Sequence, residues 1–290
     1  MNRILITGAS GNVGQQVVSQ LLGTGVHVRA LSRDPLSAAF PPGVEVVGGD
    51  LTQPETLDEC LEGIDSVFLV WFASPDAVPA AIERIAKHAR RVVFLSSPYQ
   101  TAHPLFQGAQ PNPISSLHAE IERRIKASGL DWTFLRPGMF ASNARHWWAG
   151  QILAGDVVRW PYALAPTAPI HEGDIAAVAI RALCDSACSS ADYLVTGPES
   201  LTQREQVSII GEVLGRPLRF AEITPDEWRS ELPSYVPAHV APMLLKAWAA
   251  AIGQPALVTS TVAEITGVPA RTFREWAKHN ATAFTEARAV

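Results

Sequence analysis

RILITGASGNVG, residues 3–14, is the stretch that decides the fold class of this chain. Its first five residues, Arg3–Thr7, form an apolar run typical of a buried parallel strand. Three glycines follow, at Gly8, Gly11 and Gly14, in a GxxGxxG spacing, and a helical pattern extends over Val13–Leu22. A strand that passes through a glycine-rich turn into a helix indicates a Rossmann-type dinucleotide-binding unit.

Each glycine has its own role in this prediction. Gly8 permits a tight turn out of the strand, Gly11 lets backbone N–H groups approach a pyrophosphate, and Gly14 allows the helix to pack closely on the sheet. The N-terminal end of the helix favours anionic phosphates. The motif therefore predicts dinucleotide binding, and the alternative is a Rossmann-like fold that has lost its ligand.

Strand and helix patterns alternate along the following part of the chain. Strands are predicted at Val26–Leu31, Val44–Val47, Ser66–Phe72, Arg91–Leu95 and Trp132–Leu135, and helices at Thr56–Leu61, Ala77–Ala89 and Ser115–Ser128. This alternation predicts right-handed βαβ units, and therefore an α/β fold with a Rossmann-type doubly wound parallel sheet.

The pattern changes after about Met139, where Pro and Ala become frequent and strands become short. Helices are predicted at Ile175–Leu183, Arg204–Leu214 and Thr272–Phe284, and in the second half of Trp228–Gly253. We expect a smaller, mainly helical C-terminal substrate lobe over the ends of the sheet strands. The expected domains are residues 1–150 for NAD(P) binding and residues 151–290 for the substrate lobe, partly interleaved with the Rossmann core.

Composition narrows the class of protein. The chain has 290 residues, 47% of them hydrophobic and 18% charged, with a formal net charge of −5 and no basic cluster, so no nucleic-acid partner is expected. The three cysteines, Cys60, Cys184 and Cys188, suit a reducing compartment better than a disulfide framework or a metal site. No signal peptide or membrane span is visible, so we expect a cytoplasmic protein with a small-molecule substrate. The oligomeric state is left open.

The ends of the second and third strands indicate which dinucleotide binds. An NAD-binding chain usually has an acidic residue after the second strand, whereas here Ser32 and Arg33 come first. An arginine can pair with a 2′-phosphate, so NADPH is favoured as the cofactor over NADH, although Asp34 follows directly. After the third strand, Asp50 could accept from the adenine amino group or could cap the next helix, and Leu51 could pack on the base.

Taken together, several blocks resemble the atypical short-chain dehydrogenases, and specifically the NmrA-like branch. The blocks are ILITGASGNVG, VVGGDL, LEGIDSVFLV, VVFLSS, HAEIERRIKASGLDWTFLRPGMF, PIHEGDIAAVA and VTGPESLTQREQVSIIGEVLGRP, within residues 3–225. The resemblance implies an NAD(P)-binding Rossmann core, with Ser10, Asn12 and Val13 at the pyrophosphate and Arg33 at the 2′-phosphate. It also implies that the nicotinamide end is bordered by Trp71, Phe72, Pro137, Gly138, Met139 and Phe140.

The chain departs from an ordinary short-chain dehydrogenase at the catalytic pair. None of its four tyrosines has a lysine four residues later, so the Tyr-x-x-x-Lys pair is missing. At the expected place stand His118 and Glu122, which a helix puts on one face. His118 could donate the proton with Glu122 orienting it or raising its pKa, or the pair could simply order the helix.

Hydroxyl groups after the fifth strand are further candidates. Ser96 and Ser97 stand where the family's catalytic serine usually lies, and could polarise a substrate carbonyl or make an ordinary strand-end hydrogen bond. Tyr99 is another possible donor, and solvent or substrate could also supply the proton.

Two groups of residues in the C-terminal half can be interpreted as structural or as functional. Asp174 is interpreted as a helix cap, and His171 as structural or facing a pocket. Aromatic and Met side chains could line a pocket for a flat apolar substrate or could form the core of the lobe. They are Trp147, Trp148, Trp160, Trp228, Tyr235, His239, Met243 and Trp248.

The favoured function is an NADPH-dependent reductase of a ketone, quinone or other conjugated carbonyl, with an aromatic ketone of secondary metabolism as one candidate substrate. A non-catalytic, NADP(H)-sensing regulatory protein is the main alternative, because NmrA-like regulators also lack the Tyr-x-x-x-Lys pair. A nicotinamide-dependent isomerase is a further alternative that the same fold permits.

Overall fold

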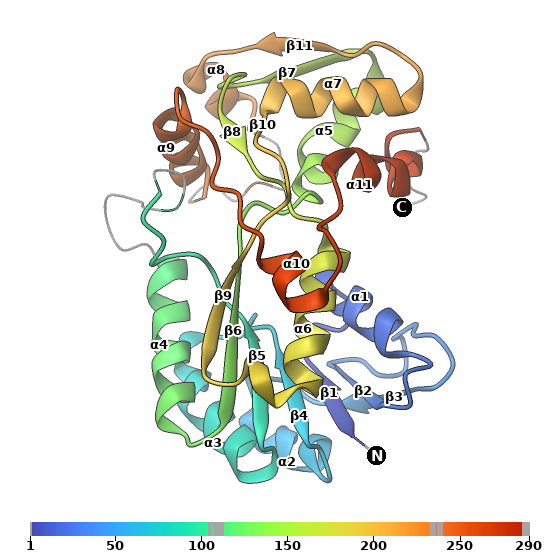
Figure 1. The fold of residues 1–290 in the computed structure, drawn as a ribbon, viewed down its shortest axis with the longest axis vertical. Coiled ribbons are helices and arrows are strands. Elements are labelled where there is room, and N and C mark those ends of the chain that lie inside the picture. The colour runs from blue at the N-terminus through green and yellow to red at the C-terminus, as the bar shows by residue number, and fades with distance from the viewer. Residues whose placement is uncertain (1, 104–105, 107–112, 233–235, 237–239, 286–290) are drawn as a thin grey trace.

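Seven parallel strands form the central sheet, in the order β3-β2-β1-β4-β5-β6-β9 (Figure 1). The computed structural model describes residues 2–103, 106, 113–232, 236 and 240–285. The strands are β1 (Arg3–Ile6), β2 (His27–Ser32), β3 (Val44–Gly48), β4 (Ser66–Leu69), β5 (Arg91–Leu95), β6 (Asp131–Pro137) and β9 (Ala191–Val195). The parallel, doubly wound sheet confirms the predicted fold class.

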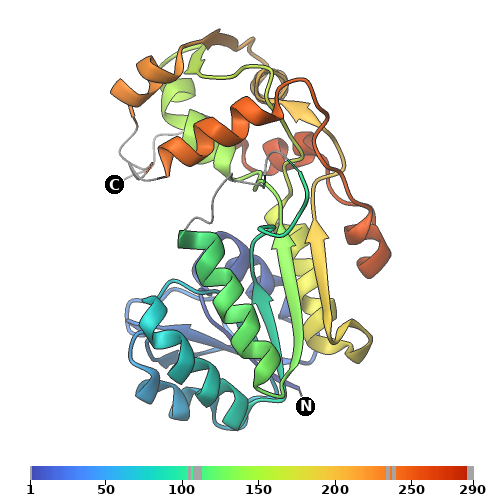
Figure 2. The same ribbon diagram turned by 90° about the vertical axis from the view of Figure 1, so that its left-hand side faces the viewer.

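Helices cover both faces of this sheet (Figures 1 and 2). One face carries α1 (Asn12–Leu21) and α6 (Glu172–Cys184), and the other carries α2 (Leu57–Leu61), α3 (Val78–His88) and α4 (Pro113–Ala127). Because side chains alternate along a strand, Ile4 and Ile6 join the core on the first face and Leu5 joins the core on the second. This two-sided burial explains why the central strands β1, β4 and β5 are mainly apolar.

A second, smaller lobe lies beyond the carboxyl ends of the strands (Figure 1). Its helices are α5 (Asn143–Ala154), α7 (Gln203–Leu214), α8 (Pro225–Ser230), α9 (Ala241–Ala251) and α11 (Phe273–His279). Two short strand pairs accompany them, β7 (Val157–Trp160) with β11 (Arg219–Glu222) and β8 (Pro166–Thr167) with β10 (Leu201–Thr202). Single-turn helices occur at η1 (Pro54–Thr56), η2 (Pro75–Ala77), η3 (Ser186–Cys188) and η4 (Ala281–Phe284).

The chain passes between the two parts more than once. The strand β9 and the helix α6 belong to the central sheet and its cover, although both lie in the C-terminal half. Helix α10 (Thr261–Thr266) also returns to this part, where Val262 packs in the same core as α6 (Figure 1). The division near residue 150 stays a prediction.

Two predicted elements end at least three residues later than the observed ones, and one strand of the central sheet was not predicted. Strand β4 ends at Leu69 rather than Phe72, because the next N–H group, that of Val70, donates to the Thr7 hydroxyl (2.7 Å) instead of a strand neighbour. Strand β9 was not predicted. The final helix was predicted to reach Phe284 but α11 ends at His279, and the chain continues as the separate turn η4.

The tryptophans of the lobe form its core rather than a pocket lining. The side chains of Trp148, Trp160, Trp228 and Trp248 are at most 2% exposed, and the ring of Trp160 lies 5.2–6.3 Å from those of the other three. For these four tryptophans the pocket-lining alternative is therefore wrong and the core alternative is right, since aromatic surface is buried most effectively against other aromatic rings. The predicted Tyr235 and His239 lie outside the described residues.

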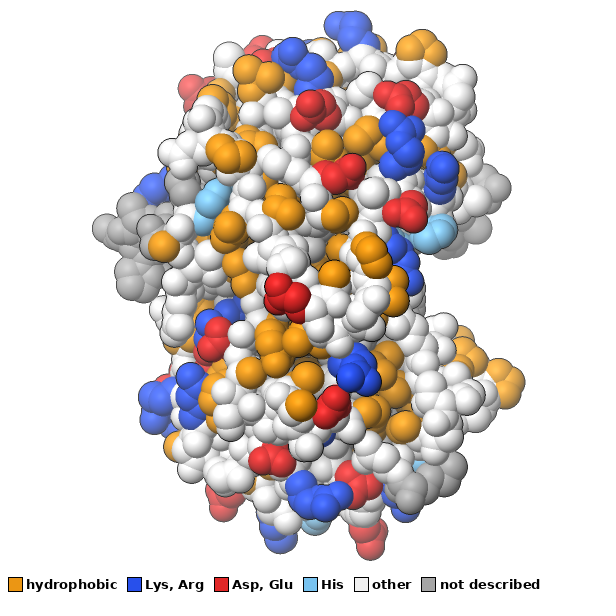
Figure 3. Space-filling model, in the orientation of Figure 1, with side chains coloured by type: hydrophobic (Ala, Val, Ile, Leu, Met, Phe, Trp, Pro, Cys, Tyr) orange, Lys and Arg blue, Asp and Glu red, His pale blue; other side chains and the backbone are white. Residues whose placement is uncertain are grey.

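The described part of the chain contains no helix long and apolar enough to cross a membrane. On the face shown in Figure 3, acidic and basic side chains are interspersed over both parts of the molecule. No group of three or more His, Cys, Asp or Glu side chains among the described residues is arranged to hold a metal ion.

Candidate cofactor and active site

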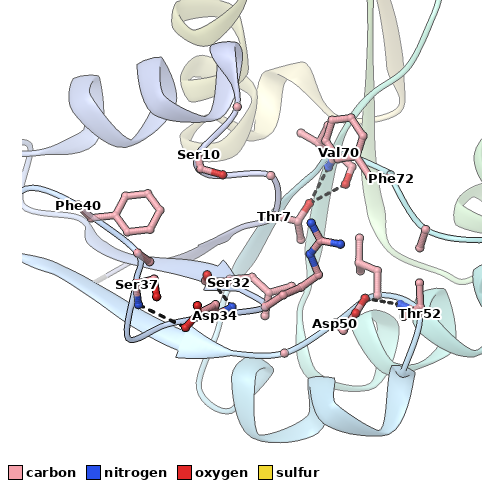
Figure 4. A pocket seen from close by; sticks show the side chains of 18 of the residues that line it. Thr7, Ser10, Ser32, Asp34, Ser37, Phe40, Asp50, Thr52, Val70 and Phe72 are labelled. Atoms are coloured by element: carbon pink, nitrogen blue, oxygen red, sulfur yellow. Dashed lines mark hydrogen bonds between the residues drawn. The ribbon is translucent and has the colours of Figure 1, made fainter. Parts of the chain in front are cut away.

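A cavity of about 650 Å³ opens at the carboxyl ends of β1, β2 and β4 (Figure 4). The chain winds outward from β1 in one direction through β2 and β3, and in the other direction from β4 onward. Such a switch point is where open parallel sheets bind nucleotides. The cavity is lined by Thr7, Gly8, Ser10, Gly11, Leu31–Asp34, Ser37–Phe40, Gly49–Thr52, Val70, Phe72 and Ala73.

The glycine-rich turn has the geometry that a bound diphosphate requires. Gly8 has a φ of +60°, which favours glycine, and Gly11 donates its N–H to the Gly8 carbonyl (2.9 Å). A Cβ on Gly14 would lie 2.1 Å from the Gly8 oxygen, so only glycine lets α1 approach the turn this closely. Among the described residues, no side chain caps α1 and no acidic residue lies in its first turn. Its positive end is therefore left for an anion.

Thr7 joins the ends of two strands beneath the cavity, and the sequence did not single it out. Its side chain is buried, and its hydroxyl accepts from the Val70 N–H (2.7 Å) and donates to the Val70 carbonyl (3.0 Å) (Figure 4). This pairing fixes the segment that carries Phe72, whose side chain is 80% exposed and lines the cavity. An exposed aromatic ring beside such a cavity is available to contact a ligand.

Arg33 and Asp34 lie at the part of the cavity that follows β2, and they differ in their hydrogen bonds. Arg33 is exposed and forms no hydrogen bond or ion pair with the described residues. Asp34 accepts from the Ser37 N–H (3.3 Å), and hydrogen bonding to Ser37 lowers the pKa of Asp34 (Figure 4). The arginine is thus the group left free to meet a ligand phosphate, while the carboxylate stabilises its own loop.

Asp50 and Leu51 also lie in this cavity. The Asp50 carboxylate accepts from the Thr52 N–H (2.8 Å), which stabilises the turn after β3 (Figure 4). It does not cap η1 or α2, so the helix-cap alternative is wrong. Leu51 is 9% exposed and presents its remaining surface to the cavity.

The other predicted cofactor residues do not line this cavity. Val13 is on the buried face of α1, Trp71 donates its indole N–H to the Ala73 carbonyl (2.8 Å), and the Asn12 amide is held by Ser142 and Arg145. The remaining ones lie at the end of β6 or just after it, at Pro137, Gly138, Met139 and Phe140. Their contacts with a cofactor stay predictions.

The buried carboxylate of Glu122 accepts hydrogen bonds from most of the polar side chains near the end of β5. Glu122 accepts from the Ser96 hydroxyl (2.6 Å) and the Tyr99 hydroxyl (2.9 Å), and from Arg136 through two bonds (3.1 and 2.7 Å). Arg136 also pairs with Asp192 on β9 (3.0 Å). Burial, with Glu122 beside it, raises the pKa of Tyr99 to about 12. The hydroxyl protons of Ser96 and Tyr99 are therefore both engaged in hydrogen bonds to Glu122.

His118 is paired with Ser97, not with Glu122. Its Nδ1 lies 2.6 Å from the Ser97 Oγ, and no hydrogen bond joins its ring to the Glu122 carboxylate. Burial lowers the pKa of His118, and the charge of Glu122 opposes this only in part. The expectation that Glu122 orients His118 by a direct hydrogen bond is wrong, because Arg136 and two hydroxyls occupy the carboxylate. Glu122 does raise the pKa of His118 as expected, but burial lowers it by more.

Ser97 and His118 lie next to the cavity along the same edge of the sheet. β5 neighbours β4, whose continuation carries Phe72, and Ser97 follows β5 by two residues. Because carboxyl ends of parallel strands meet at one edge, the couple stands one strand beyond the cavity, on the side away from Arg33. A dinucleotide with its adenosine at Arg33 would extend its other end in this direction.

The pair formed by His171 and Asp174 has a structural role. His171, not Asp174, caps α6, since its Nδ1 accepts from the Gly173 N–H (2.9 Å). Asp174 is 3% exposed, accepts from the Arg271 N–H (2.7 Å) and pairs with the Arg271 guanidinium. The predicted cap at Asp174 is therefore wrong, because that carboxylate fastens the segment before α11.

Comparison with known protein families gives a match over most of the Rossmann part. The NAD(P)H-binding family matches residues 8–186. A (4-alkanoyl-5-oxo-2,5-dihydrofuran-3-yl)methyl phosphate reductase from Streptomyces griseus is 40% identical over 97% of this chain and 99% of its own length. An NAD(P)H azoreductase from Xenophilus azovorans is 34% identical over 97% of this chain and 99% of its own length.

Solved structures share the same fold at lower identity. An NADPH-dependent quinone oxidoreductase from Escherichia coli, solved with NADPH, superposes with a TM-score of 0.78 at 21% identity, over 95% of this chain and 99% of its own. A triphenylmethane reductase from Citrobacter, solved with NADP(H), gives 0.77 at 18% identity, over 96% and 99%. The chain belongs to the NAD(P)H-binding family and is an NAD(P)H-dependent oxidoreductase.

Proposed function

We propose that the protein is an NADPH-dependent reductase of a small conjugated carbonyl compound, such as a quinone or an unsaturated ketone or lactone. The observation that carries this proposal is the 2.6 Å couple between Ser97 and His118 beside the cofactor cavity. A sensor that only binds the cofactor has no need of a proton donor there. The reductases of Streptomyces griseus and Xenophilus azovorans support a reduction as the reaction. An aromatic ketone of secondary metabolism stays a candidate substrate.

The preference for NADPH over NADH rests on Arg33. Its exposed guanidinium lines the cavity without a partner among the described residues, whereas Asp34 is turned toward Ser37. Guanidinium groups bind phosphate through planar, charge-assisted hydrogen bonds. The Gly8–Gly14 turn and the uncapped end of α1 would hold the pyrophosphate, and Leu51 would pack on the adenine.

Proton delivery is assigned to Ser97 and His118. When bound, NADPH supplies the hydride, and reduction of a carbonyl or of a conjugated double bond then requires one proton. Ser97 donates its hydroxyl proton to the substrate oxygen and recovers one from the Nδ1–H of His118. The His118 Nε2 makes no hydrogen bond with the described residues, so it can take the replacement proton from solvent. A neutral His118 suits this relay, because each nitrogen then has one role.

The test combines cofactor binding with turnover. Fluorescence titration should show NADPH binding at least tenfold tighter than NADH binding, because a charge-assisted bond contributes about 1.5–3 kcal/mol. Absorbance at the reduced-nicotinamide band should then fall when quinones, unsaturated lactones and aromatic ketones are added in turn. Tight binding without oxidation of NADPH by any of these classes would favour the sensor, and failure to bind either cofactor would overturn the proposal.

A further inference from the structure

Glu122 connects three strands and one helix behind the Ser97–His118 couple. It stands on α4, and its two oxygens accept from Ser96 and Tyr99 after β5 and from Arg136 on β6. Arg136 continues the connection to Asp192 on β9. Glu122 and Arg136 are 2% and 6% exposed, so these bonds form away from solvent and hold their geometry firmly.

Both members of the couple are fixed next to this carboxylate. Ser97 lies between Ser96 and Tyr99, whose hydroxyls both donate to Glu122. The backbone that carries Ser97 is therefore held on each side by the same group. His118 precedes Glu122 by one helical turn on α4, so its place is set by the same rigid helix. The ring of His118 also packs edge-on against Phe94, 5.6 Å away.

The couple also lies close to the charges of this network. Burial lowers the pKa of His118, and the negative charge of Glu122 opposes that lowering in part. Arg136 binds the same carboxylate through two hydrogen bonds. The network thus adjoins both members of the couple.

We propose that Glu122 is a positioning residue that acts through Ser97: its carboxylate fixes the Ser96–Tyr99 segment so that the Ser97 Oγ meets the His118 Nδ1. This inference rests on the proposed function for its catalytic meaning, but the hydrogen bond itself can be observed without turnover. Glu122 makes no hydrogen bond with Ser97 in the described part of the chain and does not line the cofactor cavity, so its effect on the reaction is indirect.

Glu122→Gln is the main test, because the amide keeps the size of the side chain. One side of the glutamine presents an NH₂ group, which cannot accept from Tyr99 or Arg136. The kcat should fall at least tenfold while the Kd for NADPH stays within twofold of the wild type. Glu120→Gln is the matched control, since Glu120 lies on the same helix and pairs at the surface with Arg123 and Arg124. Its kcat should not change.

A double-mutant cycle separates positioning from general damage. If Glu122 acts through Ser97, adding Glu122→Gln to Ser97→Ala should produce no further loss of kcat. The proposal would be overturned if the kcat of the double variant fell by the product of the two single losses, or if Glu122→Gln alone left kcat unchanged. If Glu122→Gln fails to fold, Ser96→Ala, which removes only one donor to the carboxylate, takes its place in the same cycle with the same criteria.

NMR of the imidazole nitrogens of His118 keeps this test independent of the proposed function. In the wild type, the signals should show a single tautomer of the His118 ring, fixed by the hydrogen bond between Nδ1 and Ser97. Glu122→Gln should alter these signals, whereas Glu120→Gln should not. Unaltered His118 signals in Glu122→Gln would overturn the positioning role. Altered signals in a protein whose wild type oxidises no NADPH would instead overturn the proposed reaction and leave the positioning role standing.

Discussion

Replacing Gly14 by alanine tests whether the close approach of α1 to the glycine-rich turn matters as much as the geometry indicates. The added Cβ would lie 2.1 Å from the Gly8 oxygen and 2.8 Å from the Ala9 Cα, whereas ordinary contact begins at 3.4 Å. The turn would have to recede by about 1.3 Å, and the obstructing atoms are backbone, so no side-chain rotation relieves the contact. Overpacking of this kind costs about 3 kcal/mol, and the better helix propensity of alanine returns about 1 kcal/mol.

We therefore expect Gly14→Ala to lower the free energy of unfolding by about 2 kcal/mol and to weaken NADPH binding at least tenfold. Urea unfolding followed by circular dichroism measures the first quantity and cofactor fluorescence the second. Gly150→Ala is the matched control, because Gly150 lies inside helix α5 with nothing within 4 Å of its added Cβ. It should raise stability by about 0.5–1 kcal/mol. A Gly14→Ala protein as stable as Gly150→Ala, with normal NADPH binding, would refute the reasoning.

Three further perturbations have definite expected outcomes. Arg33→Ala should weaken NADPH binding by about 10- to 100-fold and leave NADH binding unchanged in fluorescence titrations; an equal loss for both cofactors would contradict the assigned role. Burial lowers the pKa of His118 in the folded protein below its ordinary value of 6.5. At a pH between these two pKa values the unfolded chain therefore binds more protons than the folded one, and the free energy of unfolding falls as the pH is lowered from 6.5 toward the folded pKa. Urea unfolding at several pH values should show a smaller fall in His118→Gln, and equal slopes would count against a buried neutral ring. Arg271→Met, which leaves the buried Asp174 carboxylate without its cation, should lower the free energy of unfolding by about 1–3 kcal/mol, against no change for the exposed Arg123→Met.

The parts of the fold that depend on local pattern were predictable from sequence. The glycine spacing placed the turn between β1 and α1, and apolar runs separated by helices indicated the parallel sheet. Strand β9, ADYLV, was not predicted because it lies at the edge of the sheet, where only one of its five residues is fully buried and the apolar pattern is weak. Residues from three strands complete the active-site network, and such long-range contacts leave no periodic trace in the sequence.

The candidate site shows the same limit. The spacing of His118 and Glu122 correctly predicted a shared helix, but not their partners. Ser97 meets the histidine and Arg136 meets the glutamate because β5 and β6 lie side by side in the sheet. The tryptophans of the lobe were ambiguous for a related reason, since composition alone does not separate a core from a pocket lining, and the observed packing decides for the core.

Single-turnover oxidation of bound NADPH by a substrate found in the carbonyl panel tests the central claim most directly. The account predicts that Ser97→Ala slows this step by about 10²- to 10⁴-fold, the usual contribution of a positioned proton donor, while the Kd for NADPH is unchanged. A Ser97→Ala protein that reduces the substrate at the wild-type rate would contradict the assignment of proton delivery to Ser97 and His118.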